Sequence, residues 1–231
     1  MRFMFAALLW LITFSSVGVA SAETPQELTT LCQRGNAIAC TLLGNMYHNG
    51  TGVTQDSFKA VELYRKACDG QSVVGCFSLG NMYHNGTGVT QDKFKAVEFY
   101  RKACDGQDAR GCSNLGVMYD KGTGVTQDSF KAVEFYQKAC DGQYAAGCSN
   151  LGVMYEDGTG VRQDKFKAVE LYRKACEGQA TAGCTNLGRM YEKGTGVRQS
   201  VADALTFFGK ACDLKDADGC ENYARLKTGR K

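Results

Sequence analysis

Histidine, proline and net charge are all scarce in this chain. Its 231 residues include two histidines and one proline, and 27 basic residues nearly balance 24 acidic ones, for a formal net charge of +3. Zinc sites use closely spaced pairs such as C-x2-C, with a second pair or a histidine nearby, and the chain has no C-x2-C pair. Nucleic acid usually meets a clustered basic face, whereas basic and acidic residues are interleaved here. We therefore expect neither a metal site nor a nucleic acid partner.

Sequence motifs of common catalytic sites are also missing. The chain has no S-x-x-K, G-x-S-x-G or H-E-x-x-H motif and no Walker A loop. Its recurring G-T-G-V stretches lack the lysine that follows a phosphate-binding loop, and they open no strand-loop-helix unit. The residues thus identify no catalytic group and imply no cofactor.

A long hydrophobic run is absent as well. The apolar run from Phe3 to Phe14 is shorter than the roughly 20 residues of a transmembrane helix. It follows Arg2 and precedes the small residues Ala20-Ser21-Ala22, an order typical of a cleavable secretory signal. No cysteine directly follows Ala22 to carry a lipid anchor. We expect residues 1–22 to be removed after Ala22 and residues 23–231 to work in the periplasm or outside the cell, without a membrane span.

Twelve cysteines form the most regular feature of the sequence. They fall into C-x7-C pairs that recur every 36 residues. On one unbroken helix the partners would lie roughly 12 Å apart, beyond the roughly 7 Å Cα limit for a disulfide. Asp-Gly or Glu-Gly between the cysteines of four pairs predicts that a helix ends there at glycine. We predict local disulfides and no free thiol in an oxidising compartment, with the pairs Cys32–Cys40, Cys68–Cys76, Cys104–Cys112, Cys140–Cys148, Cys176–Cys184 and Cys212–Cys220.

Each 36-residue period predicts two helices. Apolar residues recur at helical spacing from Asn36 to Tyr47 and again from Ser57 to Cys68. The glycine-rich stretch between them breaks the first helix, and Asp56 is placed to cap the second. Five such pairs follow one another. A capping helix opened by Thr24 precedes them, and a single helix over 216–227 ends the array.

The repeated unit from Cys112 to Cys140, CSNLGVMYDKGTGVTQDSFKAVEFYQKAC, resembles the tetratricopeptide-like repeats of the Sel-one-like class. Four units carry the signature LG, MY, G-x-GV and KA almost unchanged. With its paired cysteines the chain is similar to the secreted cysteine-rich protein (Hcp) family, from about Thr24 to Leu226. The resemblance implies an all-α fold: a right-handed α/α solenoid of about five helix pairs plus capping helices, clasped by disulfides. It thus implies one solenoid domain over residues 23–231.

Most repeated residues have a structural interpretation. The first helices carry a glycine where a side chain would hold the second helix away, at Gly44, Gly80, Gly116, Gly152 and Gly188. A tyrosine then recurs at a core position, at Tyr47, Tyr83, Tyr119, Tyr155 and Tyr191. Function must therefore depend on the positions at which the repeats differ.

Positions that differ between repeats are expected on the concave face, because the resemblance to tetratricopeptide repeats implies that the first helices line it. Units one and two offer neutral polar groups around one exposed aromatic, whereas the later units become charged. Such a mixture suits a peptide ligand. Two histidines of this set would make binding sensitive to pH between 5 and 7.5. The candidate binding residues are Asn45, His48, Asn49, Phe77, Asn81, His84 and Asn85.

Two functions remain open from the sequence. The first is a secreted or periplasmic scaffold, monomeric, whose concave groove binds a peptide or protein partner of the host or the cell envelope. The second follows from the resemblance alone: members of the Hcp family are described as penicillin-binding proteins with weak β-lactamase activity. That resemblance implies a β-lactam or peptidoglycan-derived ligand, although no serine stands beside a base.

Overall fold

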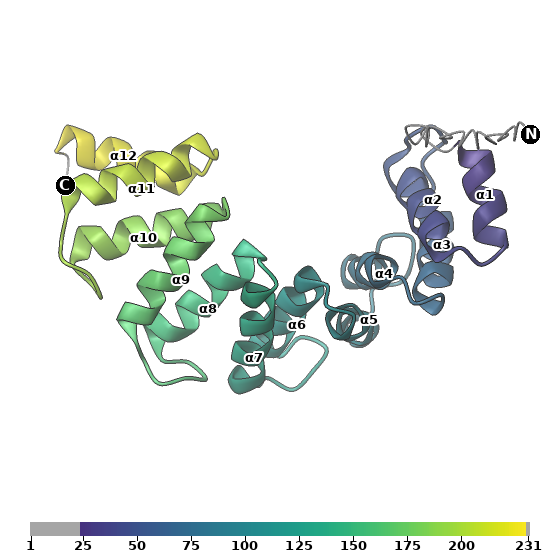
Figure 1. Cartoon of the computed structure of the whole chain (residues 1–231), viewed down its shortest axis with the longest axis horizontal. Coiled ribbons are helices and arrows are strands. Elements are labelled where there is room, and N and C mark those ends of the chain that lie inside the picture. The colour runs from purple at the N-terminus through teal and green to yellow at the C-terminus, as the bar shows by residue number, and fades with distance from the viewer. Residues whose placement is uncertain (1–23, 230–231) are drawn as a thin grey trace, which may run out of the picture.

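A computed structural model describes residues 24–229, and all regular structure within them is helical. The expected secretory signal and its cleavage site lie outside the described residues. The helices follow one another as an array that bends into an arc (Figure 1). Their bounds are α1 Pro25–Gln33, α2 Ala37–Asn49, α3 Ser57–Asp69, α4 Val73–Asn85, α5 Lys93–Asp105, α6 Ala109–Lys121, α7 Ser129–Asp141, α8 Ala145–Asp157, α9 Lys165–Glu177, α10 Thr181–Lys193, α11 Val201–Asp213 and α12 Ala217–Thr228.

The expected five helix pairs, with one helix before and one after them, are confirmed. The even-numbered helices α2 to α10 are the first helices of the pairs, and the odd-numbered helices α3 to α11 are the second helices. Thr24 and Glu27 form the capping box of α1. Asp56 caps α3 by accepting hydrogen bonds from the backbone N–H groups of Phe58 and Lys59. At the other end of α2, Gly50 adopts a left-handed φ of 72° and stops the helix.

At the clasp turns the helices end at glycine, as predicted, but the glycine is not the left-handed residue of the turn. Gly70 follows α3 with φ of −81°, and the left-handed residue is the next one, Gln71, with φ of 66°. The N–H of Gln71 donates to the carbonyl of Cys68, and the N–H of Ser72 donates to Ala67, which is a Schellman motif. Glycine is needed for space instead, because a Cβ on Gly70 would lie 2.9 Å from the Cβ of Ala37.

All six predicted disulfides are present, and no cysteine of the described residues is free. Their Cα separations run from 4.4 to 4.7 Å, within the normal range. Each bond ties the last turn of one helix to the first turn of the next. The first five are buried, whereas Cys212 and Cys220 are half-buried. Six disulfides suggest an oxidising extracellular or periplasmic environment.

Within each pair the first-helix glycine lets an aromatic ring of the second helix approach, as predicted. A Cβ on Gly116 would lie 2.6 Å from the ring of Tyr136, and the other four positions are equally tight. The recurring tyrosines of the first helices behave less uniformly than expected. Tyr83 and Tyr119 are buried, but Tyr47, Tyr155 and Tyr191 are only half-buried. The fully buried aromatic rings belong instead to the second helices, for example Tyr100 and Phe208.

Stability should decrease toward the C-terminal end of the array. Gly219 is the only buried residue of α12, and α11 contains Gly209, which costs roughly 1 kcal/mol against alanine inside a helix. Since each repeat packs mainly on its neighbours, α11 and α12 should exchange their backbone amide hydrogens faster than α5 to α8. Native-state hydrogen exchange checks this. Equal rates throughout, or fastest exchange in α6 and α7, would contradict it.

Candidate functional site

The first helices of neighbouring repeats lie side by side and share one surface. Contacts join α2 to α4, α6 to α8 and α8 to α10. In the middle of the arc, α4 and α6 lie on its inner side, above α5 and α7 in the view of Figure 1. The residues expected to bind a ligand lie on α2 and α4, the first helices of the first two repeats.

A cavity of about 450 Å³ lies between the first two repeats. It brings together four of the seven predicted residues, Asn45 and His48 of α2 with Asn81 and Asn85 of α4. Asn49 is exposed and does not line it. The structure adds four lining residues that the sequence did not identify: Tyr64, Ser78, Met82 and Thr87. No charged side chain lines the cavity, which agrees with the neutral character predicted for this half of the surface.

Tyrosines of the second helices fix the orientation of the two central asparagines. The Tyr64 hydroxyl donates to Oδ1 of Asn45 over 2.7 Å, and the Tyr100 hydroxyl donates to Oδ1 of Asn81 over 2.8 Å. Burial raises the pKa of each tyrosine to about 12, so both remain donors at neutral pH. Because Oδ1 is occupied, each asparagine offers its Nδ2 hydrogens to a ligand. Asparagine and tyrosine recur 19 positions apart in both repeats, but the spacing alone does not reveal this contact between helices.

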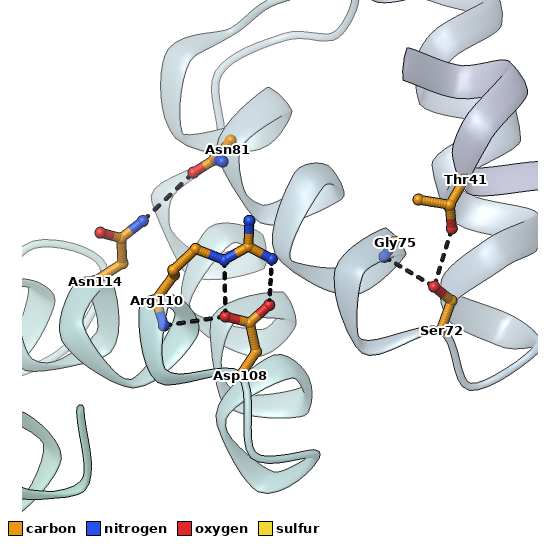
Figure 2. Close-up of polar contacts among 7 residues, drawn as sticks. All are labelled: Thr41, Ser72, Gly75, Asn81, Asp108, Arg110 and Asn114. Atoms are coloured by element: carbon orange, nitrogen blue, oxygen red, sulfur yellow. Dashed lines mark hydrogen bonds and ion pairs between the residues drawn. The ribbon is translucent and has the colours of Figure 1, made fainter. Parts of the chain in front are cut away.

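Neighbouring repeats are joined by further polar contacts near the cavity. Figure 2 shows Nδ2 of Asn114, on α6, directed at Oδ1 of Asn81 on α4, at 3.4 Å. It also shows the hydroxyl groups of Thr41 and Ser72 in contact at 2.9 Å, while Ser72 accepts a hydrogen bond from the N–H of Gly75. Asn114 therefore adds a second hydrogen bond to Oδ1 of Asn81 and helps to fix the orientation of that side chain.

Phe77 is not the exposed aromatic that the sequence predicted. It is half-buried, with its ring centroid 6.1 Å from that of Tyr100. The Arg110 guanidinium lies over its face, 4.4 Å from the centroid. Asp108 holds that guanidinium through two hydrogen bonds, of 3.0 and 2.6 Å (Figure 2). An arginine one repeat away thus covers the ring, and Phe77 lies outside the cavity.

The two histidines have different surroundings. In both, Nδ1 is buried without a hydrogen-bond partner, but only His48 lines the cavity. The His84 ring lies 6.2 Å from that of Tyr100. Burial lowers the pKa of His84, and the positive charges of Lys93 and Lys121 lower it further. Of the two histidines, only His48 is therefore placed to contact a ligand in the cavity.

His84 should make folding stability depend on pH. Its pKa is lower in the folded protein than in the unfolded chain, so the unfolded chain takes up the proton first as the pH falls. The contribution of His84 to the free energy of unfolding should be fully present above about pH 6.5. It should be lost as the pH falls through the folded-state pKa. Denaturant melts between pH 7.5 and 5 should show this decrease, and His84→Asn should reduce it. An identical decrease in the variant would contradict the assignment.

The same surface becomes charged beyond the second repeat, as predicted. In the fourth repeat Val153 stands at the position of Asn45. There the Tyr172 hydroxyl donates instead to Oε2 of Glu156, at 2.7 Å. In the fifth repeat Glu192 pairs with Arg225 of α12 at 2.7 Å. Between residues 24 and 229 no group of three or more histidine, cysteine, aspartate or glutamate side chains could hold a metal ion. No helix in that range has the length and apolarity to span a membrane.

Comparison with known families agrees with this geometry. The model of the Sel1 repeat matches residues 37–72, 73–108, 109–144, 145–179 and 181–216, and each match starts with the first residue of a first helix. The chain belongs to the Sel1 repeat family. With these boundaries Cys32–Cys40 joins α1 to the first Sel1 repeat, and each later disulfide joins one repeat to the segment that follows it.

Solved structures share the Sel1 repeat fold. One is c5321, a protective antigen of uropathogenic Escherichia coli, with 31% identity, a TM-score of 0.80 and coverage of 88% of this chain. The matched part is 44% of the antigen, so this chain spans less than half of its length. A Sel1 repeat protein from Oxalobacter formigenes has 25% identity and a TM-score of 0.82, covering 87% of this chain and 82% of its own. No curated protein matches the chain.

Helicobacter pylori cysteine rich protein B also matches. It is 34% identical over 57% of this chain and 94% of its own, with a TM-score of 0.47.

Proposed function

We propose that this Sel1 repeat protein is a secreted or periplasmic scaffold that binds an extended peptide segment of a protein partner. The binding site is the groove formed by the cavity of the first two repeats. The Sel1 repeat fold supports a scaffold role, and the disulfides support an oxidising compartment. The proposal also assigns the chain to the secreted cysteine-rich protein (Hcp) family, a narrower group than the Sel1 repeat family.

Two asparagine amides whose orientation is fixed carry the proposal. Tyr64 and Tyr100 occupy Oδ1 of Asn45 and Asn81, so both Nδ2 groups are left as donors, one repeat apart. The carbonyl groups of an extended peptide are acceptors at regular spacing and are neutral, like the cavity lining. Thr87 and Asn85 lie at the same cavity and can bond to the peptide N–H groups.

Hydrolysis of β-lactams is not proposed as a second function. Within residues 24–229 no serine hydroxyl is hydrogen-bonded to a histidine, lysine or carboxylate side chain that could activate it. Turnover of nitrocefin by the purified protein should therefore be slow or absent. Rapid turnover that survives repeated purification would show that the protein does contain an activated nucleophile.

A peptide selected against the purified protein from a random library tests the groove. The double variant Asn45→Asp with Asn81→Asp keeps the acceptors for both tyrosines but replaces the amide donors by carboxylates. Titration calorimetry should show an affinity about tenfold or more weaker, with an unchanged melting temperature. Asn150→Asp, on the same surface two repeats away, should bind like the parent protein. Equal affinity of the double variant and the parent would contradict the proposal.

A further inference from the structure

We propose that the loop of the fourth repeat holds a second binding site, for an acidic peptide segment that carries an aromatic side chain. The site is a hollow of about 700 Å³, here called the loop hollow. It shares no residue with the groove of the first two repeats. Its lining residues are Tyr155, Val161, Arg162, Gln163, Asp164, Lys165 and Phe166.

The floor and wall of the loop hollow are apolar. Tyr155 and Val161 are half-buried and pack against the core, whereas the Phe166 side chain is 74% exposed at the start of α9. The loop between them is held in shape by backbone contacts. Nε2 of Gln163 donates to the carbonyl of Glu156 at 2.7 Å, and the N–H of Asp164 donates to the carbonyl of Tyr155 at 2.9 Å. An aromatic side chain of a ligand can pack between Phe166 and this floor.

The rim of the loop hollow has an excess of positive charge. Arg162 and Lys165 are exposed, and neither lies within 4.0 Å of a carboxylate in residues 24–229. The one acidic residue of the lining, Asp164, caps α9 by accepting a hydrogen bond from the N–H of Lys167 at 2.9 Å. Two cations without partners beside an apolar floor complement a ligand in which carboxylates flank an aromatic residue.

The other repeats show that this charge is specific to the loop. Arg162 replaces the threonines Thr54, Thr90 and Thr126 of the first three repeats. The third repeat has the same apolar residues at the equivalent positions, Tyr119, Val125 and Phe130, but Thr126 and Ser129 replace the two cations. The fifth repeat keeps an arginine, Arg198, but has Ala202 at the position of Phe166. Only the fourth loop combines the exposed phenylalanine with both cations.

A peptide fits this surface better than a lipid bilayer does. Phe58, Phe94, Phe130 and Phe166 are each 73 to 77% exposed, at the start of α3, α5, α7 and α9. Figure 1 shows α5 end-on and α7 from the side, so the helices that carry these rings point in different directions. A flat membrane could not contact all of them, whereas a short segment needs a single hollow.

The test uses a fluorescein-labelled peptide of the sequence Gly-Ser-Glu-Phe-Glu-Glu-Ser-Gly and the whole protein. Fluorescence anisotropy should show one site whose affinity falls as salt rises. Arg162→Thr with Lys165→Ser gives the fourth loop the residues of the third and should weaken binding about tenfold or more. Thr126→Arg with Ser129→Lys makes the reverse exchange and should raise the stoichiometry from one to two. All four positions are exposed or half-buried, so melting temperatures should not change.

Each contrary result would overturn the proposal. One is the absence of binding at about 1 mM peptide, and another is unchanged affinity in the Arg162→Thr, Lys165→Ser variant. A third is that the peptide does not bind, while phosphatidylglycerol vesicles bind the parent protein but not this variant. The loop would then be a lipid contact. The Asn45→Asp, Asn81→Asp variant should bind this peptide normally, which separates the loop hollow from the groove.

Discussion

Complete reduction of the six disulfides is expected to unfold the protein at 25 °C. Each bond closes a loop of about nine residues, which on the chain-entropy model stabilises the folded state by about 2–3 kcal/mol. Six such contributions amount to about 12–18 kcal/mol, comparable to the roughly 5–15 kcal/mol by which folded proteins are usually stable. Helical circular dichroism should therefore disappear after reduction and alkylation. A reduced protein that keeps its helical signal and melts cooperatively would contradict this expectation.

Reduction should also proceed in a defined order along the chain. Cys212 and Cys220 are half-buried, whereas the cysteines of the other five bonds are buried. Since exchange requires access of a thiolate to the sulfur, the Cys212–Cys220 bond should be reduced first. Brief treatment with dithiothreitol, alkylation and peptide mapping would identify it. First labelling of Cys140 and Cys148 would argue against burial as the controlling factor.

Two glycine-to-alanine substitutions inside helices should have opposite effects on stability. In Gly116→Ala the new methyl group would lie 2.6 Å from the buried ring of Tyr136. The helix pair α6–α7 must then separate, at a cost of about 1–3 kcal/mol. In Gly209→Ala the nearest atoms, on the Tyr223 ring, are 3.4 and 3.6 Å away, which is ordinary contact. That variant should gain up to about 1 kcal/mol from helix propensity.

Urea unfolding of both variants measures the difference directly. Gly116→Ala should have a lower midpoint than the parent protein, and Gly209→Ala a higher one, with similar slopes. The two substitutions add the same methyl group to a helix, so each is the control for the other. Stabilisation by both would mean that close packing does not explain the first-helix glycines.

The period of the sequence was sufficient to predict the array, because each repeat is specified by local signals. Asp56, Gly50 and the cysteine spacing act within a few residues of their own positions, and the helices begin and end close to where these signals place them. Glycine at the clasp predicted the end of the helix correctly, but not why glycine is required there. Gly70 is required by its contact with Ala37, a contact between helices that sequence spacing alone does not reveal.

The candidate groove was predicted only in part, because its character depends on contacts between different helices. Phe77 was expected to be exposed, but Arg110 of the next repeat covers it. Tyr64 is buried in the core, yet its hydroxyl reaches Asn45 of the preceding helix. Apolar spacing identifies which face of a helix is buried. It does not show where the polar end of a tyrosine lies, or which long side chain crosses from a neighbour.

The side-chain amide resonances of Asn45 and Asn81 test the central claim most directly. In ¹H–¹⁵N spectra of the protein with the library-selected peptide, the Nδ2 signals of these two residues should shift and exchange more slowly with water. Those of Asn150 and Asn186, on the charged half of the same surface, should stay unchanged. Shifts confined to Asn150 and Asn186, with no change at Asn45 and Asn81, would contradict the proposed groove.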